Sequence, residues 1–299
     1  MITVPRRELS STDWNKYVQK QTGGWWWHRS EWLDYSLAYR PDAVDHSVAF
    51  VSKEGNVVGV VPAIVDNGRV AMGDDPCIVP LVNKRLRVGE VMELLDSTPI
   101  LSFPLAWRWC SEPVEQQPLS VLTGLAQREG FTFQQWATQC IDLEDVTIGE
   151  LWKGIRKSYK SLIHAAERTY LIVTGGAELW SDYERCHKKM ATRPRPQATY
   201  DHQREWTAHN RARVVVAYGS GGLINPTVGF RFLTPSQPQD GIMGGSSPLT
   251  STRPVIATAL AFVYKQRAYY ASAASTERNV QHACQWAMMC DLSCYDVHT

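Results

Sequence analysis

Basic side chains are concentrated in one stretch near the middle of the chain. Arg156, Lys157 and Lys160 lie at positions i, i+1 and i+4, so on a helix Arg156 and Lys160 would share a face. Arg193 and Arg195 are each followed by a proline, which predicts a stiff loop that carries two guanidinium groups. Grouped cations of this kind bind phosphate or carboxylate groups. We therefore predict an anion-binding site, and the alternative is a solvated charged surface.

Two further positions have side chains that could move a proton. Tyr269 and Tyr270 are adjacent on a predicted strand, so one side chain points to each face of the sheet. We predict that Tyr270 relays a proton; the alternative is a packed aromatic. Asp74 and Asp75 lie in a Gly-Asp-Asp-Pro loop, where the Asp75 carboxylate could receive the proton of an amine. Ordinary turn chemistry is the alternative for this loop.

Small residues and tryptophans suggest places where a substrate could approach. Gly244 and Ser246 lie at a glycine-rich strand end, where small side chains let a substrate backbone come close. An ordinary turn is the alternative. The chain has 12 Trp, three of them consecutive at 25–27. We predict that Trp27 lines a groove, while most of the other tryptophans pack in the core.

Several kinds of catalytic site lack their sequence signature. The histidines show neither an HExxH motif nor the Cys/His spacing of a zinc site. No Gly-x-Ser-x-Gly motif is present, so a serine nucleophile of the hydrolase type is not supported. We expect no metal site and no covalent nucleophile.

Length and composition indicate an ordinary globular chain. The 299 residues are 44% hydrophobic, which is typical of a chain that buries a sizeable core. No run of about 18 apolar residues occurs, and the N-terminus has no apolar segment of the secretory type. The seven cysteines are scattered without a CxxC pair. These features predict a cytoplasmic protein with no membrane span.

The net charge of +1 hides an uneven distribution. Residues 1–150 carry 13 basic and 20 acidic side chains, whereas residues 151–213 carry 13 basic and 6 acidic ones. This asymmetry favours two modules and an anionic ligand. The alternative is that basic helices of the second half dock on the acidic half.

The order of predicted elements indicates a mixed α/β chain. Helices are predicted over 11–20, 30–38, 88–95, 119–129, 147–170, 177–190, 200–210, 252–266 and 280–289. Strands are predicted over 46–52, 56–64, 131–136, 138–143, 171–174, 213–218, 227–233, 269–274 and 293–297.

The segment 151–168, with the sequence LWKGIRKSYKSLIHAAER, resembles the "lW..lrks.r..irkAer.g" segment of the FemABX-like transferases. Weaker similarities follow the same order along nearly the whole chain. They lie at 27–33, 140–143, 228–233, 241–247, 253–266 and 269–272.

This resemblance implies tandem GNAT-like modules with mixed central sheets flanked by helices. Residues 1–145 would form a degenerate N-terminal module, and residues 146–299 the C-terminal transferase module. Such enzymes pass an amino acid from aminoacyl-tRNA to an amine, forming an amide without a covalent enzyme intermediate. The strand that holds Arg231 resembles a family strand near the donor. The resemblance implies no required cofactor, tRNA as a partner, and an acceptor that we expect to be an anionic or phosphorylated small molecule.

Three other functions remain open from the residues. An acyl-CoA-dependent N-acetyltransferase is one, although the glycine-rich loop that would bind its pyrophosphate is absent. A non-catalytic binding module is another, because the stretch 284–290 has no lysine where the family usually has one. Nucleic-acid binding through the basic segment is the third, with Tyr159 and Trp206 as its stacking aromatics.

Overall fold

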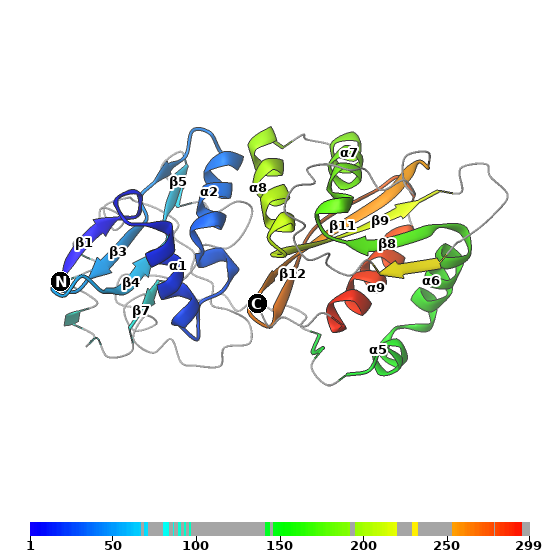
Figure 1. Cartoon of the computed structure of the whole chain (residues 1–299), viewed down its shortest axis with the longest axis horizontal. Helices are drawn as coiled ribbons and strands as arrows, with labels where there is room; N and C mark the ends of the chain where they lie inside the picture. Colours follow the sequence, from blue (N-terminus) through cyan, green and yellow to red (C-terminus); the bar gives the residue numbers. More distant parts are fainter. Residues whose placement is uncertain are drawn as a thin grey trace. The chain divides into compact units, whose positions relative to one another are not determined.

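Helices and strands build two units, Met1–Cys140 and Ile141–Thr299 (Figure 1). The computed structural model describes residues 1–66, 69–70, 80–83, 141–143, 146–191, 195–219, 229–232, 253–277 and 279–294, with isolated positions between 86 and 96. The mixed α/β class predicted from the sequence is confirmed. The assignment of each unit as a GNAT-like module stays a prediction.

The first unit contains two small antiparallel sheets among its described residues. One has the order β1-β3-β4-β7, formed by Ile2–Pro5, Val48–Val51, Val57–Val61 and Leu81–Val82. The other has the order β2-β5-β6, formed by Val44–Asp45, Ile64–Asp66 and Arg69–Val70. Gly55 in the β3–β4 turn has φ +81°, a left-handed conformation that favours glycine.

Two helices of the first unit pack their aromatic faces inward. In α1 (Ser11–Lys20), the Ser10 hydroxyl accepts a hydrogen bond from the Asp13 N–H at 3.0 Å and caps the N-terminus. The Tyr17 hydroxyl donates to the Val58 carbonyl at 2.8 Å, which ties α1 to β4. Trp32 and Tyr35 of α2 (Ser30–Tyr39) are buried. Both helices follow the predicted ranges closely.

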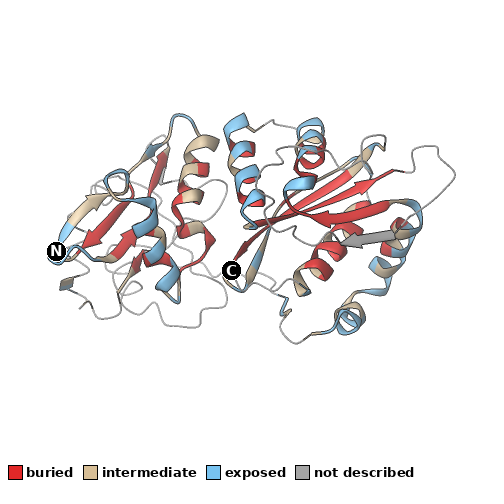
Figure 2. Cartoon of the chain, in the orientation of Figure 1, coloured by how far each residue is buried: buried red, intermediate tan, exposed pale blue. Residues whose placement is uncertain are grey.

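The second unit is a five-stranded sheet covered by helices on both faces. Its order is β10-β8-β9-β11-β12, and only the β10–β8 pair is parallel. The strands span Gly229–Phe232, Leu171–Gly175, Ala212–Tyr218, Val255–Tyr264 and Arg267–Ser275. The helices are α5 (Ile148–Gly154), α6 (Lys157–Thr169), α7 (Trp180–Met190), α8 (Gln197–Ala208) and α9 (Val280–Ser293). The strands β8, β9 and β11 are buried along almost their whole length (Figure 2).

The two faces of this sheet are distinguished by alternate residues of β11. Ala257, Ala259 and Ala261 pack with Cys284 and Ala287 of α9, in the same core as part of α6. On the opposite face, Phe262 lies edge-on against Trp206 of α8, with ring centroids 5.0 Å apart. Small side chains facing α9 let that helix approach the sheet closely.

A β-bulge interrupts the alternation of β12. Leu260 of β11 pairs with Ser272, and the next residue, Ala261, pairs with Tyr270, so Ala271 is an extra residue in β12. Consequently, Ser272 and Tyr270 point to opposite faces although they are two positions apart. The Ser272 hydroxyl lies 2.6 Å from the hydroxyl of Tyr183 on α7, whereas Tyr270 contacts α9.

The predicted helix over 252–266 is wrong, because residues 255–264 form the strand β11. Alanine and leucine in this run have high helix propensity, which favoured the prediction of a helix. A strand covered on both faces shows no polar alternation, so its apolar run resembles a buried helix. The predicted strand over 293–297 is also wrong at its start, since Ser293 ends α9. The elements predicted between 119 and 140 lie outside the described residues.

Candidate active site

The connection between α5 and α6 carries most of the predicted basic residues. A capping box starts α5: Thr147 accepts from the Glu150 N–H at 3.2 Å, and Glu150 accepts from the Thr147 N–H at 2.9 Å. The helix ends at Gly154, and Ile155 and Arg156 have extended ψ values of 137° and 140°. The single helix predicted over 147–170 is therefore wrong, and Arg156 does not share a helical face with Lys160. Arg156 is instead the N-cap of α6.

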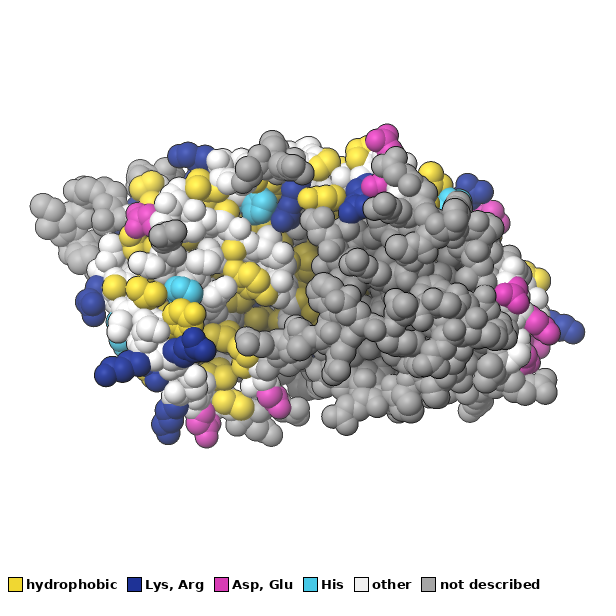
Figure 3. All heavy atoms as spheres, turned by 180° about the vertical axis from the view of Figure 1, so that it is seen from behind, with side chains coloured by type: hydrophobic (Ala, Val, Ile, Leu, Met, Phe, Trp, Pro, Cys, Tyr) yellow, Lys and Arg dark blue, Asp and Glu magenta, His cyan; other side chains and the backbone are white. Residues whose placement is uncertain are grey.

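Cations are gathered at the positive end of the α6 helix dipole. Lys157 opens the helix and Lys160 completes its first turn, while no acidic residue lies in that turn and no side chain caps it. Arg156 and Lys157 are exposed, and neither they nor Lys153 form an ion pair in the part of the chain that the structure describes. Positive side chains at a helix N-terminus are unfavourable unless an anion is present. Figure 3 shows Lys and Arg side chains at the lower left, around hydrophobic side chains and a histidine.

Aromatic rings from three helices lie next to these cations. Trp152 of α5 contacts Trp286 of α9 at a centroid distance of 5.0 Å, and Lys160 places its ammonium 5.6 Å from the Trp152 centroid. The ring of Tyr159 on α6 lies 4.5 Å from that of His282 on α9, tilted by 32°. Tyr159 is 39% exposed, so this ring pair stays accessible from solvent.

The predicted catalytic residue Tyr270 contacts the first turn of the same helix α9. Its oxygen accepts a hydrogen bond from the Gln281 amide at 2.8 Å, and the residue is 49% exposed. Burial of the phenol raises the pKa of Tyr270 above its ordinary value, although hydrogen bonds from Gln285 and Gln281 act in the opposite direction. The phenol therefore stays protonated at neutral pH and is a hydrogen-bond donor rather than a base.

Tyr270 and the α6 cations are linked through the start of α9. Gln281 contacts Tyr270, and the next residue, His282, contacts Tyr159 of α6. Four predicted site residues therefore lie near α9: Arg156, Lys157 and Lys160 at the start of α6, which packs on α9, and Tyr270 on the edge strand β12, which contacts α9. We call this group, together with Tyr159, Gln281 and His282, the α6–α9 site.

A buried ion pair fixes the other end of α9. Arg213 of β9 donates two hydrogen bonds to Asp291 of α9, from Nε at 2.7 Å and from Nη2 at 2.9 Å. The Thr174 hydroxyl of β8 donates to the same carboxylate at 3.0 Å. Because Arg213 and Asp291 are almost fully buried, this network holds α9 in a defined position on the sheet.

Arg195 lies elsewhere, between α7 and α8 on the opposite face of the sheet. It acts on His187 of α7, whose imidazole lies 3.0 Å from the Tyr200 hydroxyl of α8. Burial, with a smaller contribution from the Arg195 charge, lowers the pKa of His187 to about 4, so the imidazole is neutral at pH 7. The structure does not bring Arg195 together with the α6 cations.

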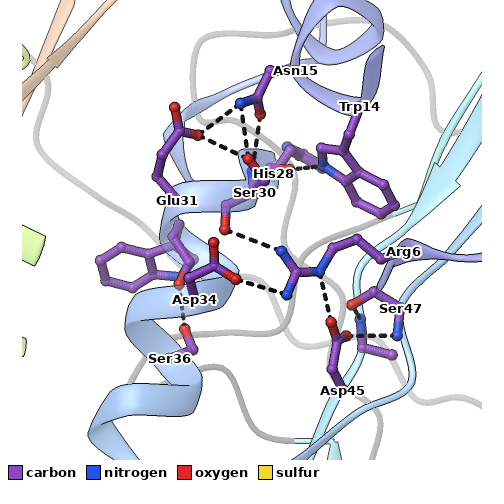
Figure 4. A network of polar contacts seen from close by, with 12 residues as sticks. Arg6, Trp14, Asn15, His28, Ser30, Glu31, Asp34, Ser36, Asp45 and Ser47 are labelled. Atoms are coloured by element: carbon purple, nitrogen blue, oxygen red, sulfur yellow. Dashed lines mark hydrogen bonds and ion pairs between the residues drawn. The ribbon is translucent and has the colours of Figure 1, made fainter. Parts of the chain in front are cut away.

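The first unit holds its tryptophan-rich segment with a polar network (Figure 4). Arg6 donates to Asp45 at 2.6 Å and to Asp34 at 2.8 Å, joining the end of β1 to β2 and α2. The indole of Trp14 donates to the His28 carbonyl at 2.7 Å. These bonds fix the turn that precedes α2.

Trp27 projects from this turn and packs among other indoles. Its ring centroid lies 4.9 Å from that of Trp25 and 5.5 Å from that of Trp32. Trp27 is half-buried. The prediction that it lines a substrate groove stays a prediction.

The other predicted site residues are described in part or not at all. Asp75, Arg193, Gly244 and Ser246 lie outside the described residues. Arg231 pairs through its backbone with Val173 in the β10–β8 ladder, and the structure describes only its backbone.

Sequence reasoning missed the contribution of α9 to this site. Gln281, His282 and Gln285 belong to no motif, and they reach the site only because α9 packs on the sheet beside α6. Trp206, predicted as a stacking residue, is only 1% exposed and belongs to the core.

The described residues lack a metal-binding cluster and a membrane-spanning helix. No group of three or more His, Cys, Asp and Glu side chains there is arranged to hold a metal ion. Among the same residues, no helix is both long and apolar enough to cross a membrane.

The comparisons with known proteins point to one fold. No family model matches the chain, and no curated protein matches it. Among solved structures, the crystal structure of FemX is similar with a TM-score of 0.59 and 11% sequence identity. The match covers 97% of this chain and 85% of the FemX chain. At this identity the likeness shows the fold alone, and the chain therefore has a FemX-like fold.

Proposed function

We propose that the chain is a transferase that moves an aminoacyl group from aminoacyl-tRNA to an amine acceptor. The observation that carries the proposal is the FemX-like fold over 97% of the chain. The similarity of residues 151–168 to FemABX-like transferases supports the same function, and this segment supplies the cations of the α6–α9 site.

The reaction needs positioning and charge stabilisation more than a nucleophile on the protein. The amine nitrogen attacks the carbonyl carbon of the aminoacyl ester, and negative charge develops on the carbonyl oxygen. The new C–N bond forms as the C–O bond to the ribose breaks, and the departing ribose oxygen takes up a proton. We assign Tyr270 as the donor to the oxyanion, because its hydroxyl stays protonated and its oxygen is held by Gln281.

The remaining roles follow from the residue types. Arg156, Lys157 and Lys160 bind phosphate groups of a substrate, since they concentrate positive charge at the N-terminus of α6. Asp75 remains our candidate to receive the proton of the amine. Arg231, Gly244 and Ser246 remain candidates to bind substrate.

The test is a transfer assay with a labelled donor. The purified chain is mixed with tRNA charged with radiolabelled amino acids and with a panel of amines that includes phosphorylated amines and amino sugars. We expect ATP-independent formation of labelled amide, and a parallel reaction with acetyl-CoA should give none. Labelling from acetyl-CoA instead would make the chain an N-acetyltransferase.

Tyr270→Phe separates catalysis from binding. Removing one donor to an oxyanion typically lowers kcat by about 100- to 1,000-fold. We expect a loss of this size with tRNA affinity unchanged. If the wild-type chain binds charged tRNA but transfers nothing, the non-catalytic binding module is the better explanation.

A further inference from the structure

The α6–α9 site combines exposed cations at the start of α6 with the accessible ring pair of Tyr159 and His282. Phosphate groups alone would require only Arg156, Lys157 and Lys160. Proteins that bind single-stranded nucleic acid combine a positively charged surface with aromatic rings on which bases stack. The α6–α9 site has both features within neighbouring turns of α6 and α9.

The rings of Tyr159 and His282 lie together because α6 packs against α9. Tyr159 leaves 39% of its surface exposed while its ring rests 4.5 Å from that of His282. Resting on His282 limits the motion of the tyrosine ring, so a base that stacks on its open side loses little rotamer entropy. Buried Trp206 takes no part, so the stacking residues come from α6 and α9 only.

The neighbouring charges suit a polyanion. Arg156 and Lys157 precede Tyr159 by three and two positions. Both are exposed and form no ion pair in the described parts of the chain. Lys160 is directed differently, because its ammonium donates to the Lys153 carbonyl at 3.3 Å and lies over the Trp152 ring. The two exposed cations are therefore available to phosphates next to a stacked base.

We propose that Tyr159, supported by His282, is a stacking site for an unpaired base of RNA, whose flanking phosphates bind Arg156 and Lys157. This inference rests on the proposed function, in which the donor is a tRNA with a single-stranded end. It assigns the phosphate-binding residues to the RNA donor and not to a phosphorylated acceptor.

The test measures binding of a fluorescein-labelled single-stranded RNA of 12 nucleotides by fluorescence anisotropy at fixed salt. Tyr159→Ala should weaken binding by about 5- to 150-fold, the range for loss of one base-stacking ring. Tyr159→Phe keeps the ring and should stay within about 2-fold of wild type. An abasic oligonucleotide of equal length should bind Tyr159→Ala and wild type equally.

A charge series tests the phosphate contacts. Removing both cations with Arg156→Ala and Lys157→Ala should flatten the slope of log K against log salt by about 1.4, or about 0.7 per phosphate contact on a single strand. Lys20→Ala is the matched control, since Lys20 is exposed on α1 in the other unit, and it should leave the slope unchanged. Circular dichroism of each variant checks that the fold is retained.

Each result supports or overturns the inference. It is overturned if Tyr159→Ala binds the RNA as wild type does, or if double-stranded RNA of equal length binds as tightly and responds equally to Tyr159→Ala. The transfer assay is separate: unchanged RNA binding by Tyr159→Ala together with active transfer would remove the stacking site and leave the proposed function intact. RNA binding that depends on Tyr159, without any transfer, would support the stacking site and argue against the proposed function.

Discussion

Breaking the buried Arg213–Asp291 pair tests how α9 is held on the sheet. Asp291→Ala leaves a guanidinium that is 2% exposed without its carboxylate partner, and it also removes the acceptor of the Thr174 hydroxyl. Removing one partner of a buried ion pair costs about 3–5 kcal/mol, because the remaining charge is buried and uncompensated. Since domains are stable by about 5–15 kcal/mol, this is a large part of the total.

The measurement is urea unfolding followed by tryptophan fluorescence and circular dichroism. Thr174→Val should cost about 1 kcal/mol, because it removes one hydrogen bond and leaves the ion pair in place. The control is Arg204→Ala: Arg204 lies 3.9 Å from Asp201 on the surface of α8, with both side chains more than half exposed. Such a pair contributes about 0–1 kcal/mol, so the transition should barely move.

A double variant separates the buried charge from the general disturbance of the core. Arg213→Met with Asp291→Leu replaces both charges by apolar side chains, and we expect it to recover most of the stability lost in Asp291→Ala. The reasoning is refuted if Asp291→Ala costs less than about 1 kcal/mol, or if the double variant is no more stable than the single one.

Three other outcomes are expected. His187 has a pKa of about 4 in the folded chain against 6.5 unfolded, so the stability from its neutral form is present above pH 6.5 and is lost as the pH falls toward 4. Between pH 7 and pH 5 this loss is about 2 kcal/mol, and His187→Gln should abolish that part of the pH dependence of urea unfolding. Peptide mapping after brief iodoacetamide treatment at pH 8 should find Cys294 modified and Cys284 intact, because Cys284 is buried and its pKa is raised to about 12, whereas Cys294 is exposed. Equal labelling of the two would contradict this burial. Finally, Gly24→Ala should destabilise the first unit in thermal unfolding, since a Cβ there would lie 2.1 Å from the Val18 carbonyl oxygen; an unchanged Tm would show that the turn can move.

The sequence predicted best those elements whose pattern depends on local chemistry. The capped helix α1 was predicted with its correct bounds, and the strands β8, β9 and β12 were predicted within three residues. β11 was not, because a strand packed against helices on both faces has no polar side to reveal its period. The break at Arg156 was also missed, since Ile155 continued the apolar pattern of the preceding helix.

The residues of the candidate site also differ in whether the sequence could predict them. Arg156, Lys157 and Tyr270 could be selected because charge and a phenol are visible in the sequence. Gln281 and His282 could not, because they lie more than 100 positions from Tyr159 and become neighbours only when α9 packs beside α6. Conversely, Trp206 was predicted to stack on a base because of its residue type. It is buried because α8 packs over β11, which the sequence did not reveal.

The extra residue Ala271 shifts by one position the alternation of β12 side chains between the two faces of the sheet. On the hairpin side of it, even-numbered Tyr270 faces α9; beyond it, even-numbered Ser272 faces α7. Even-numbered residues of β12 therefore face α9 before Ala271 and face α7 after it. Comparing this strand with a regular one position by position would assign Tyr270 to the wrong layer. A deletion of Ala271 would make Tyr270 and Ser272 direct neighbours, so the regular alternation would keep the phenol toward α9 and the serine hydroxyl toward α7, and β12 would lose only its bulge.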